Sequence, residues 1–244
     1  MPFAAPRTAL VTGASRGLGR HVARRFGAAG MNVVLCARTD ADLHAAADEV
    51  RDAGGTPLIH RLDVRDRAAF ETCLARTRDA FGGLDILVCN AGLSPYKPLA
   101  EWSAAEIDEV LDVNLRAVVH QCHAALPDLL AASGRETGRG HVVIVASDVG
   151  RRAVPNMGPY VAAKHGVVGF AGSLLREVKG RGVRVTTLLP GVIDTHFGGG
   201  AEGTRDESWA LRPDALAATV AWAVEQPPHI VLDEITVHPM QQDF

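Results

Sequence analysis

Residues 8–19 read TALVTGASRGLG, an apolar run that leads into a glycine-rich turn. The run Thr8–Thr12 predicts a buried strand, and a helical pattern follows the turn. Glycines at positions 13, 17 and 19 let the backbone turn tightly and approach a diphosphate without a side chain in the way. The spacing is GxxxGxG rather than the more common GxGxxG, and any tight turn from strand to helix can require glycine. Its place before a helix favours an anion site, because a helix N-terminus offers unpaired N–H groups and a positive dipole end.

Short apolar runs alternate with longer helical patterns along the rest of the chain. Most runs are continuously apolar, which is typical of parallel strands that helices cover on both faces. The predicted strands are Thr8–Thr12, Asn32–Ala37, Pro57–Asp63, Ile86–Asn90, His141–Ala146, Val183–Leu189 and Glu234–His238. The predicted helices are about Leu18–Ala29, Ala41–Ala53, Arg67–Phe81, Ala104–Ala132, Tyr160–Lys179 and Pro213–Glu225. This repeated βαβ order predicts an α/β fold with a doubly wound, Rossmann-like sheet.

The chain shows no internal linker and no sequence repeat, so we expect residues 1–244 to form a single dinucleotide-binding domain. One shift in composition lies in a glycine-rich segment that joins a strand to a helix. We expect residues 195–212 to form a mobile loop that closes over the substrate. Asp66 and Ser103 are predicted helix N-caps, and Pro213 is a predicted first-turn proline.

The composition argues against several classes of function. The chain has 244 residues, of which 47% are hydrophobic and 22% charged, and its formal net charge is −3. A nucleic-acid partner would favour a basic face, and a membrane span would need about 20 apolar residues in a row. The four cysteines are dispersed without a CxxC pair, which favours reduced core thiols over disulfides or metal ligands. We therefore expect a cytoplasmic protein without a metal site, a nucleic-acid partner or a membrane partner.

The end of the second predicted strand bears on the choice of cofactor. In dinucleotide-binding folds an acidic residue at this point usually holds the ribose 2′-hydroxyl. Here the position is occupied by Arg38, whose guanidinium can bind a 2′-phosphate through two parallel hydrogen bonds. Arg16, inside the glycine turn, could lie on the same side. Two cations and no acid favour NADP(H); the alternative is that both arginines are solvated surface residues.

Tyr160, Lys164 and Ser147 are candidates for chemistry. The tyrosine and the lysine are four positions apart on a predicted helix, so their side chains share a face. A free tyrosine titrates at about pH 10, and a nearby ammonium stabilises the phenolate and lowers its pKa. The pair is therefore a plausible general acid/base. Ser147 directly follows a predicted strand, at the edge where open α/β sheets bind ligands, although a lone serine there is more often a turn or cap residue.

Taken together, the motifs resemble the classical short-chain dehydrogenase/reductase (SDR) family, in its order and spacing, over nearly the whole chain. They are TGASRGLG at 12–19, LDV at 62–64, CNAG at 89–92, VNL at 113–115, the Ser147, Tyr160 and Lys164 set, and PGVIDT at 190–195. The resemblance implies a Rossmann-like fold with seven parallel strands. The chain departs from the family at Cys89, where many members have asparagine. It also departs in its ending, QPPHIVLDEITVHPMQQDF, which is similar to 3-hydroxy acid dehydrogenases and clavulanate-pathway aldehyde reductases.

The resemblance also implies residue roles. Ser147 and Tyr160 would bind the substrate carbonyl oxygen, and Tyr160 would supply the proton. Lys164 would lower the pKa of the tyrosine and hold the ribose, and Asn114 would position a water that links Lys164 to solvent. The implied catalytic residues are Asn114, Ser147, Tyr160 and Lys164. The implied cofactor-binding residues are Gly13, Ser15, Arg16, Gly17, Leu18, Gly19, Arg38, Asp63, Val64, Asn90, Ala91, Gly92, Tyr160, Lys164, Pro190, Gly191, Ile193 and Thr195.

The implied activity is that of an NADPH-dependent carbonyl reductase or dehydrogenase that interconverts a carbonyl and an alcohol by hydride transfer. One alternative within the enzymes is a 3-oxoacyl-[acyl-carrier-protein] reductase. An alternative of another class is a non-catalytic NADP-binding sensor, which would need the glycine turn and Arg38 but not the complete catalytic set.

The expected substrate pocket is lined by residues 93–97, 149–157 and 197–209. Arg151 and Arg152 within it could bind a substrate carboxylate; the alternative is that they are solvated or lie at an interface. The family resemblance further suggests a homodimer or homotetramer in which the helices 104–132 and 160–179 pack across subunits.

Overall fold

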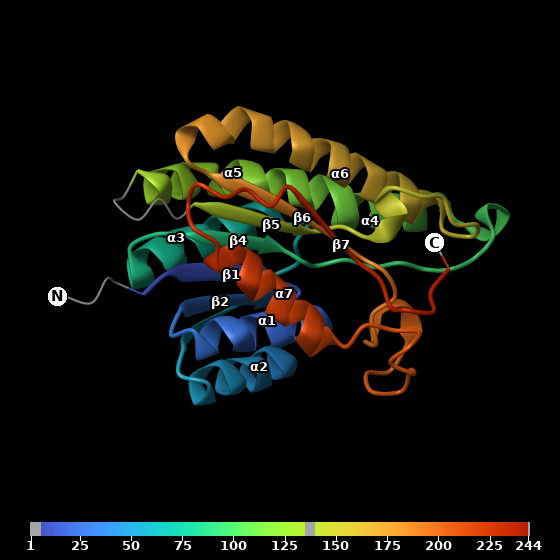
Figure 1. The fold of residues 1–244 in the computed structure, drawn as a ribbon, viewed down its shortest axis with the longest axis horizontal. Helices are drawn as coiled ribbons and strands as arrows, with labels where there is room; N and C mark the ends of the chain where they lie inside the picture. Colours follow the sequence, from blue (N-terminus) through green and yellow to red (C-terminus); the bar gives the residue numbers. More distant parts are fainter. Residues whose placement is uncertain (1–5, 135–139, 244) are drawn as a thin grey trace.

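A parallel sheet of seven strands, in the order β3-β2-β1-β4-β5-β6-β7, organises the residues that the structure describes (Figure 1). This computed structural model describes residues 6–134 and 140–243. The strands are β1 (Thr8–Thr12), β2 (Asn32–Ala37), β3 (Thr56–Arg61), β4 (Ile86–Cys89), β5 (His141–Val145), β6 (Arg184–Pro190) and β7 (Glu234–Val237). Because β1 pairs with both β2 and β4, the strand order reverses beside β1. Such a reversal leaves a crevice at the carboxyl ends of the strands, where doubly wound sheets bind ligands.

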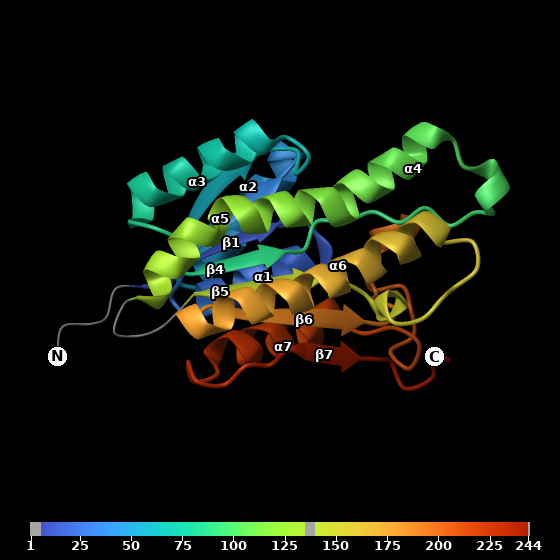
Figure 2. The same ribbon diagram turned by 90° about the horizontal axis from the view of Figure 1, so that it is seen from above.

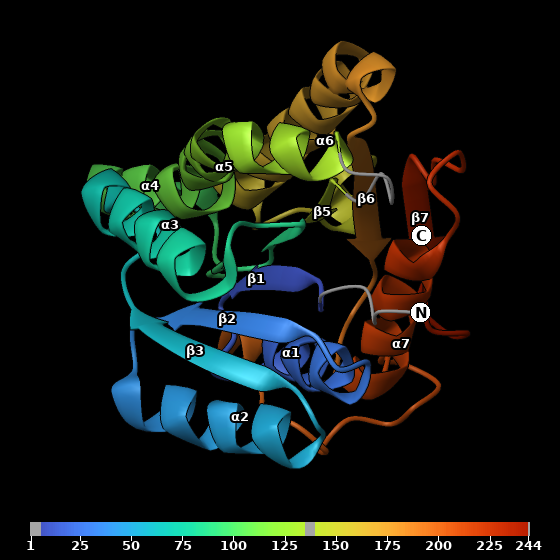
Figure 3. The same ribbon diagram turned by 90° about the vertical axis from the view of Figure 1, so that its left-hand side faces the viewer.

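Helices cover both faces of the sheet, and the end-on view in Figure 3 shows the resulting three layers. One face carries α1 (Gly17–Ala28), α2 (Asp40–Asp52) and α7 (Pro213–Glu225). The opposite face carries α3 (Arg67–Phe81), α5 (Ala117–Ser133) and α6 (Gly158–Val178), with α4 (Ala104–Leu111) continuing the line of α5 (Figure 2). An apolar core fills the space on each side of the sheet. Covered on both faces, the central strands are almost wholly buried, which explains their continuously apolar sequences.

The sequence-based prediction of this α/β architecture is confirmed, and so are several details at helix ends. The Asp66 side chain accepts a hydrogen bond from the N–H of Ala69 and caps α3. Ser103 forms a reciprocal capping box with Glu106 at the start of α4. Pro213 occupies the first turn of α7, where the absence of an N–H has no cost.

One helix differs from its prediction. Instead of a single helix over 104–132, the structure has α4 and α5 joined by a π-helical turn, Asp112–Arg116. Asn114 lies in this turn, and its side-chain amide donates to the carbonyl of Val110, four residues earlier. A side chain that competes for the carbonyl in this way loosens the ordinary i→i−4 ladder. Hydrophobic periodicity carries no signal for such a one-residue insertion.

All four cysteines are buried and free, as the sequence predicted for core thiols. The Cys36 and Cys73 sulfur atoms lie 3.5 Å apart, and this contact together with burial raises the pKa of the Cys36 thiol. Among the described helices, none is both long and apolar enough to cross a membrane.

Candidate active site

The carboxyl ends of the central strands border a cavity of about 570 Å³. Nearly all of the sequence-predicted cofactor and catalytic residues line it, although they come from positions between 13 and 195. They are Gly13, Ser15, Arg16, Gly17, Leu18, Arg38, Asp63, Val64, Asn90, Ala91, Gly92, Ser147, Tyr160, Lys164, Pro190, Gly191, Ile193 and Thr195. Two predicted residues, Gly19 and Asn114, do not line the cavity; they contact residues that do.

The glycine turn is held against the end of β4 by hydrogen bonds. The Thr12 hydroxyl oxygen accepts from the N–H groups of Asn90 and Ala91, at 3.1 and 3.2 Å. The Asn90 side-chain amide donates back to the Thr12 carbonyl at 2.9 Å. Gly13 has φ +67°, and a Cβ there would come within 2.9 Å of the same amide. Glycine is therefore required for this close approach, which leaves bare backbone at the start of α1 facing the cavity.

Gly19 lies in the first turn of α1, and its backbone packs directly on the glycine turn. A Cβ at this position would collide with the Gly13 carbonyl and lie 2.5 Å from the Asn90 side-chain nitrogen. The glycine thus serves the turn by packing rather than by facing a ligand.

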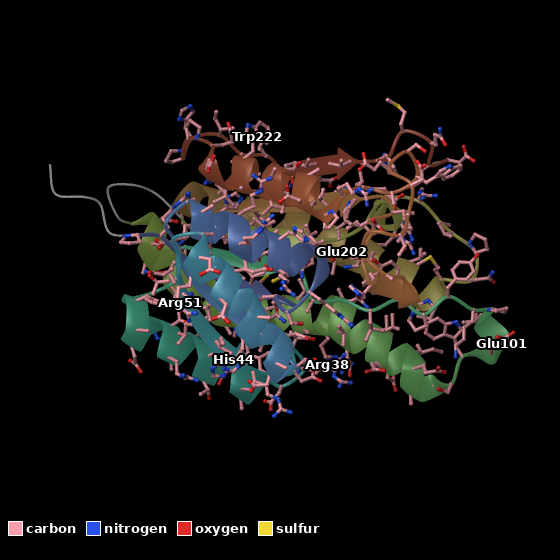
Figure 4. All side chains as sticks on the ribbon, turned by 90° about the horizontal axis from the view of Figure 1, so that it is seen from below. Arg38, His44, Arg51, Glu101, Glu202 and Trp222 are labelled. Atoms are coloured by element: carbon pink, nitrogen blue, oxygen red, sulfur yellow. The ribbon has the colours of Figure 1, made fainter. Side chains whose placement is uncertain are left out.

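Cations gather at the far end of the cavity, beside β2 and β3. Arg16 and Arg38 line this end with exposed side chains, and Figure 4 shows Arg38 at the surface. Asp63, at the same end, already accepts two hydrogen bonds from the Arg65 guanidinium, at 3.0 and 2.7 Å. This pairing, aided by nearby Arg38, lowers the pKa of the Asp63 carboxyl. The negative charge of Asp63 is balanced by its ion pair with Arg65, so Arg16 and Arg38 give this end of the cavity a positive charge.

Tyr160 and Ser147 lie at the other end of the cavity. Tyr160 enters from the first turn of α6, is 5% exposed, and packs its ring 6.0 Å from that of Phe197. Ser147 directly precedes the short helical turn η3 (Asp148–Gly150), to which it contributes the cap. Burial raises the pKa of Tyr160; the Ser147 hydroxyl opposes this rise, and the charge of Asp148 adds to it.

Lys164 lies one turn further along α6 but is directed elsewhere than we expected. Its ammonium donates to the Val145 carbonyl at 2.9 Å and stays 5.5 Å from the centre of the Tyr160 ring. Burial lowers the pKa of Lys164 to about 8. The sequence predicted a tyrosine pKa lowered by this lysine, whereas desolvation dominates and the pKa of Tyr160 is raised in this structure. Tyr160 and Lys164 do lie on the same face of α6, but the Lys164 ammonium is hydrogen-bonded to the last residue of β5 rather than to the tyrosine.

Asn114 is fully buried and ties the loop after β4 to the helix layer. Its amide nitrogen donates to the carbonyls of Leu93 and Val110, and its amide oxygen accepts from the Leu93 N–H. Both of its N–H groups bond backbone carbonyls, so a water positioned by Asn114 would be held through its side-chain or main-chain oxygen. The three hydrogen bonds also fix Leu93 along the cavity.

Parts of the expected substrate wall lie where the sequence predicted. Leu93, Val149, Val154, Met157 and Phe197 line the cavity beside Tyr160 and give it an apolar surface. Lys97 and Trp209, which bound two of the expected segments, do not line it; Lys97 is paired with Glu106.

The two arginines considered for a substrate carboxylate are paired within the protein. Arg151 is bound by Glu234, and Arg152 donates to Asp148 at 2.9 and 2.6 Å. The expected free cationic site for a carboxylate is therefore occupied by the protein's own acids.

Two cavity residues, Asp148 and Gln242, were not identified from the sequence. Asp148 is 6% exposed, and Gln242 reaches the same place from the segment after β7. A charged residue directly after a buried apolar strand was an available signal for Asp148. No local pattern marks Gln242, because its contacts lie 50 and 94 positions away.

The loop after β6 is anchored rather than open at its base. Asp194, which is fully buried, accepts from the backbone N–H groups of Gly203 and Arg205 and from the Arg212 guanidinium. Thr195 packs against the place where a Gly17 side chain would stand, which brings the loop onto the glycine turn.

Two relatives resemble the chain in sequence. A glycine betaine reductase of Emericella nidulans is 31% identical over 97% of this chain, but the chain spans only 19% of that longer protein. A monensin polyketide synthase putative ketoacyl reductase of Streptomyces virginiae is 38% identical over 78% of this chain and 71% of that protein.

Solved structures resemble the fold closely. An alcohol dehydrogenase from the archaeon Thermococcus sibiricus, complexed with 5-hydroxy-NADP, has a TM-score of 0.90 at 32% identity, over 97% of this chain and 98% of that one. A carveol dehydrogenase from Mycobacterium avium in complex with NAD has a TM-score of 0.86 at 26% identity, over 96% and 97%. The model of the short chain dehydrogenase family matches residues 7–205. Sequence match and fold agree, and the chain belongs to the short-chain dehydrogenase family of oxidoreductases.

Proposed function

We propose that the chain is an NADPH-dependent reductase that interconverts a carbonyl and an alcohol by hydride transfer, with Tyr160 as the general acid/base. One observation carries this proposal: the Tyr160 and Ser147 side chains share a continuous cavity with the glycine turn and with Arg38. A dinucleotide that lies along this cavity would have its diphosphate at the turn and its nicotinamide beside the tyrosine.

The residues that line the cavity suit a dinucleotide cofactor. A Cβ at Gly13 or Gly17 would fill space that the turn keeps clear, since each would press on Asn90 or Thr195. The N-terminus of α1 presents backbone N–H groups to a diphosphate. Thr195 and Ile193 would flank the nicotinamide, and Lys164 would hold the ribose hydroxyls. When bound, the nicotinamide supplies the hydride.

The chain's own residues would manage the oxygen of the substrate. Ser147 and Tyr160 would orient the carbonyl, and the Tyr160 hydroxyl would pass its proton to that oxygen as the carbon receives the hydride. The Tyr160 hydroxyl is protonated at neutral pH, as proton donation to the carbonyl oxygen requires. The apolar wall and the closing of residues 195–212 over the substrate would keep water away from the reacting carbon.

Arg16 and Arg38 support NADP(H) over NAD(H). A carboxylate at the end of β2 would repel a 2′-phosphate, whereas two guanidinium groups at this end of the cavity attract one. The related alcohol dehydrogenase that was solved with 5-hydroxy-NADP is consistent with this choice.

The pocket favours a neutral, largely apolar carbonyl compound. Its wall is formed by Leu93, Val149, Val154, Met157 and Phe197, and the arginines nearby are already paired. The likeness to a putative ketoacyl reductase supports a second candidate, reduction of a 3-oxoacyl thioester. A non-catalytic sensor is not supported, because Ser147, Tyr160 and Lys164 all line the cavity that the cofactor would use.

A screen of NADPH oxidation tests this proposal. The purified protein is assayed with aliphatic and aromatic ketones, aldehydes, 3-keto acids and acetoacetyl thioesters. We expect turnover with neutral ketones or aldehydes to exceed turnover with free 3-keto acids. Preference for the thioester would favour the second candidate, and binding of NADPH without turnover of any carbonyl would favour the sensor.

We also propose that the protein is a homodimer or homotetramer that packs α4, α5 and α6 across subunits, in a cytoplasmic setting. Sedimentation velocity at micromolar concentration is expected to give a dimer or a tetramer, and a monomer would contradict this.

A further inference from the structure

A buried carboxylate touches the hydroxyl that we propose binds the substrate. Asp148 is 6% exposed, and its Oδ1 accepts a hydrogen bond from the Ser147 hydroxyl at 3.1 Å. Its Oδ2 accepts from Arg152 at 2.9 and 2.6 Å and from the Gln242 side chain at 2.8 Å. The His238 imidazole lies 3.5 Å from the same oxygen. Asp148 thus joins the reacting end of the cavity to the segment that follows β7.

Gln242 connects this carboxylate to the loop along which the nicotinamide would lie. Its Nε2 donates to Asp148, and its Oε1 accepts from the Val192 N–H at 2.8 Å. Gly191 has no side chain at the point where Gln242 packs, and a Cβ there would collide with the Gln242 amide. In Figure 1 the red segment after β7 runs beside the orange loop after β6, and the Gln241 N–H donates to the Ser208 carbonyl.

An ordinary structural ion pair does not require this arrangement. Arg152 is about one-third exposed, and it could pair with a carboxylate that had no contact with the cavity. Instead, Asp148 lies in the cavity wall, and one of its carboxylate oxygens accepts a hydrogen bond from the Ser147 hydroxyl. A serine hydroxyl has one proton, and whichever acceptor takes it decides where the oxygen and its lone pairs point. Asp148 is the acceptor here, so it sets the orientation of Ser147 relative to Tyr160.

We propose that Asp148 and Gln242 are positioning residues: Asp148 orients the Ser147 hydroxyl, and Gln242 fixes Asp148 against the loop after β6. This inference rests on the proposed carbonyl reduction and names two residues beyond its catalytic set. In this positioning role both act through Ser147, and neither contacts the reacting atoms.

The charge of Asp148 has a second effect, on Tyr160. The titratable and charged groups near this end of the cavity are Lys164 from α6, Asp148 in η3, Arg152 just after η3, and His238 from the segment after β7. Asp148 raises the pKa of Tyr160 and therefore helps to keep the phenol protonated. We expect removal of this charge to lower the pKa of Tyr160, so that alcohol oxidation, which needs the phenolate, begins at lower pH.

Steady-state kinetics of carbonyl reduction test the positioning role. Asp148→Asn is expected to lower kcat about tenfold, which corresponds to the loss of one hydrogen bond to a charged group, and to change KM less than about twofold. Gln242→Ala is expected to lower kcat by a smaller factor. The matched controls are Gln241→Ala, an exposed neighbour, and Asp128→Asn, a remote aspartate paired with Arg78; both are expected to keep wild-type kcat.

A double-mutant cycle separates positioning from a general structural effect. If Asp148 acts through Ser147, Asp148→Asn in a Ser147→Ala background changes the residual kcat less than about twofold. An equal loss with and without the Ser147 hydroxyl would overturn the inference, and so would wild-type kcat in Asp148→Asn.

A readout without turnover keeps the inference separate from the proposed function. The chain has only two tyrosines, Tyr96 and Tyr160, so ¹³Cζ-tyrosine NMR follows each ring in the presence of NADP⁺. The Tyr160 ¹³Cζ shift at a fixed pH is expected to change in Asp148→Asn in the same direction as in Ser147→Ala, and to be unchanged in Asp128→Asn. If wild-type protein reduces no carbonyl but the Tyr160 shift changes in this way, the proposed function fails and the inference stands. A Tyr160 shift that is the same in Asp148→Asn as in wild type overturns the inference even where the enzyme is active.

Discussion

At the scale of single residues, Tyr160 combines burial with a place on the cavity wall. Tyr160→Phe removes the hydroxyl and keeps the ring that packs beside Phe197. We expect kcat to fall by about 10² to 10⁴, the usual contribution of a positioned general acid, while the Kd for NADPH changes less than about twofold. Absorbance at the nicotinamide band measures kcat, and a fluorescence titration measures Kd. Retained turnover in this variant would remove Tyr160 from the mechanism.

Arg38 carries the prediction of cofactor preference. Arg38→Asp places a carboxylate where a 2′-phosphate would lie, so we expect the ratio of kcat/KM for NADPH over NADH to fall by at least about a hundredfold, since a charged contact is exchanged for a repulsion. Arg51→Asp is the control, because Arg51 is an exposed arginine on α2 outside the cavity (Figure 4) and changes the net charge equally. An NADH preference in the wild-type protein would contradict the assignment.

At the scale of elements, the glycine turn works only if α1 packs closely on it. Gly19→Ala would raise helix propensity by about 1 kcal/mol, yet its Cβ would collide with the Gly13 carbonyl and the Asn90 amide. We expect the collision to prevail, with a lower Tm and a weaker Kd for NADPH. Gly134→Ala is the control: it ends α5 at φ −73°, where a Cβ finds its nearest neighbour at 3.6 Å. A Gly19→Ala protein as stable as wild type, with unchanged Kd, would show that the turn can relax.

The elements also show how far sequence reasoning reaches. Strands β1 and β2 and helices α3 and α7 have the bounds that apolar runs, caps and prolines predicted, because those signals are local. The π-helical turn at Asn114 was missed, because it depends on a side-chain hydrogen bond to Val110 rather than on periodicity. The cavity residues were found through motif order, but the pairings of Asp148 with Arg152 and Gln242 depend on how the ends of β5, β6 and β7 meet in space. The direction of the Lys164 ammonium was likewise decided by the Val145 carbonyl, which no spacing rule includes.

At the scale of the whole molecule, a buried lysine links the proposed chemistry to the stability of the fold. Burial lowers the pKa of Lys164 from 10.5 to about 8. Between these values the unfolded chain binds more protons than the folded one, so the contribution of Lys164 to stability rises with pH across this window. Below it the buried ammonium costs about 3 kcal/mol, a net value that already includes its hydrogen bond to Val145.

Lys164→Met replaces the ammonium with an apolar side chain of similar length. We therefore expect its Tm at pH 7 to exceed that of wild type by about 5 °C, and the difference to shrink as the pH rises from about 8 to 10.5. Turnover should be lost in the same variant, because the lysine would no longer hold the ribose. Lys179→Met, at an exposed lysine just after α6, is expected to shift Tm little and by a constant amount over this range. Differential scanning calorimetry across the pH series measures both Tm values. If Lys164→Met has a lower Tm than wild type at pH 7, the prediction that the buried ammonium destabilises the fold is wrong.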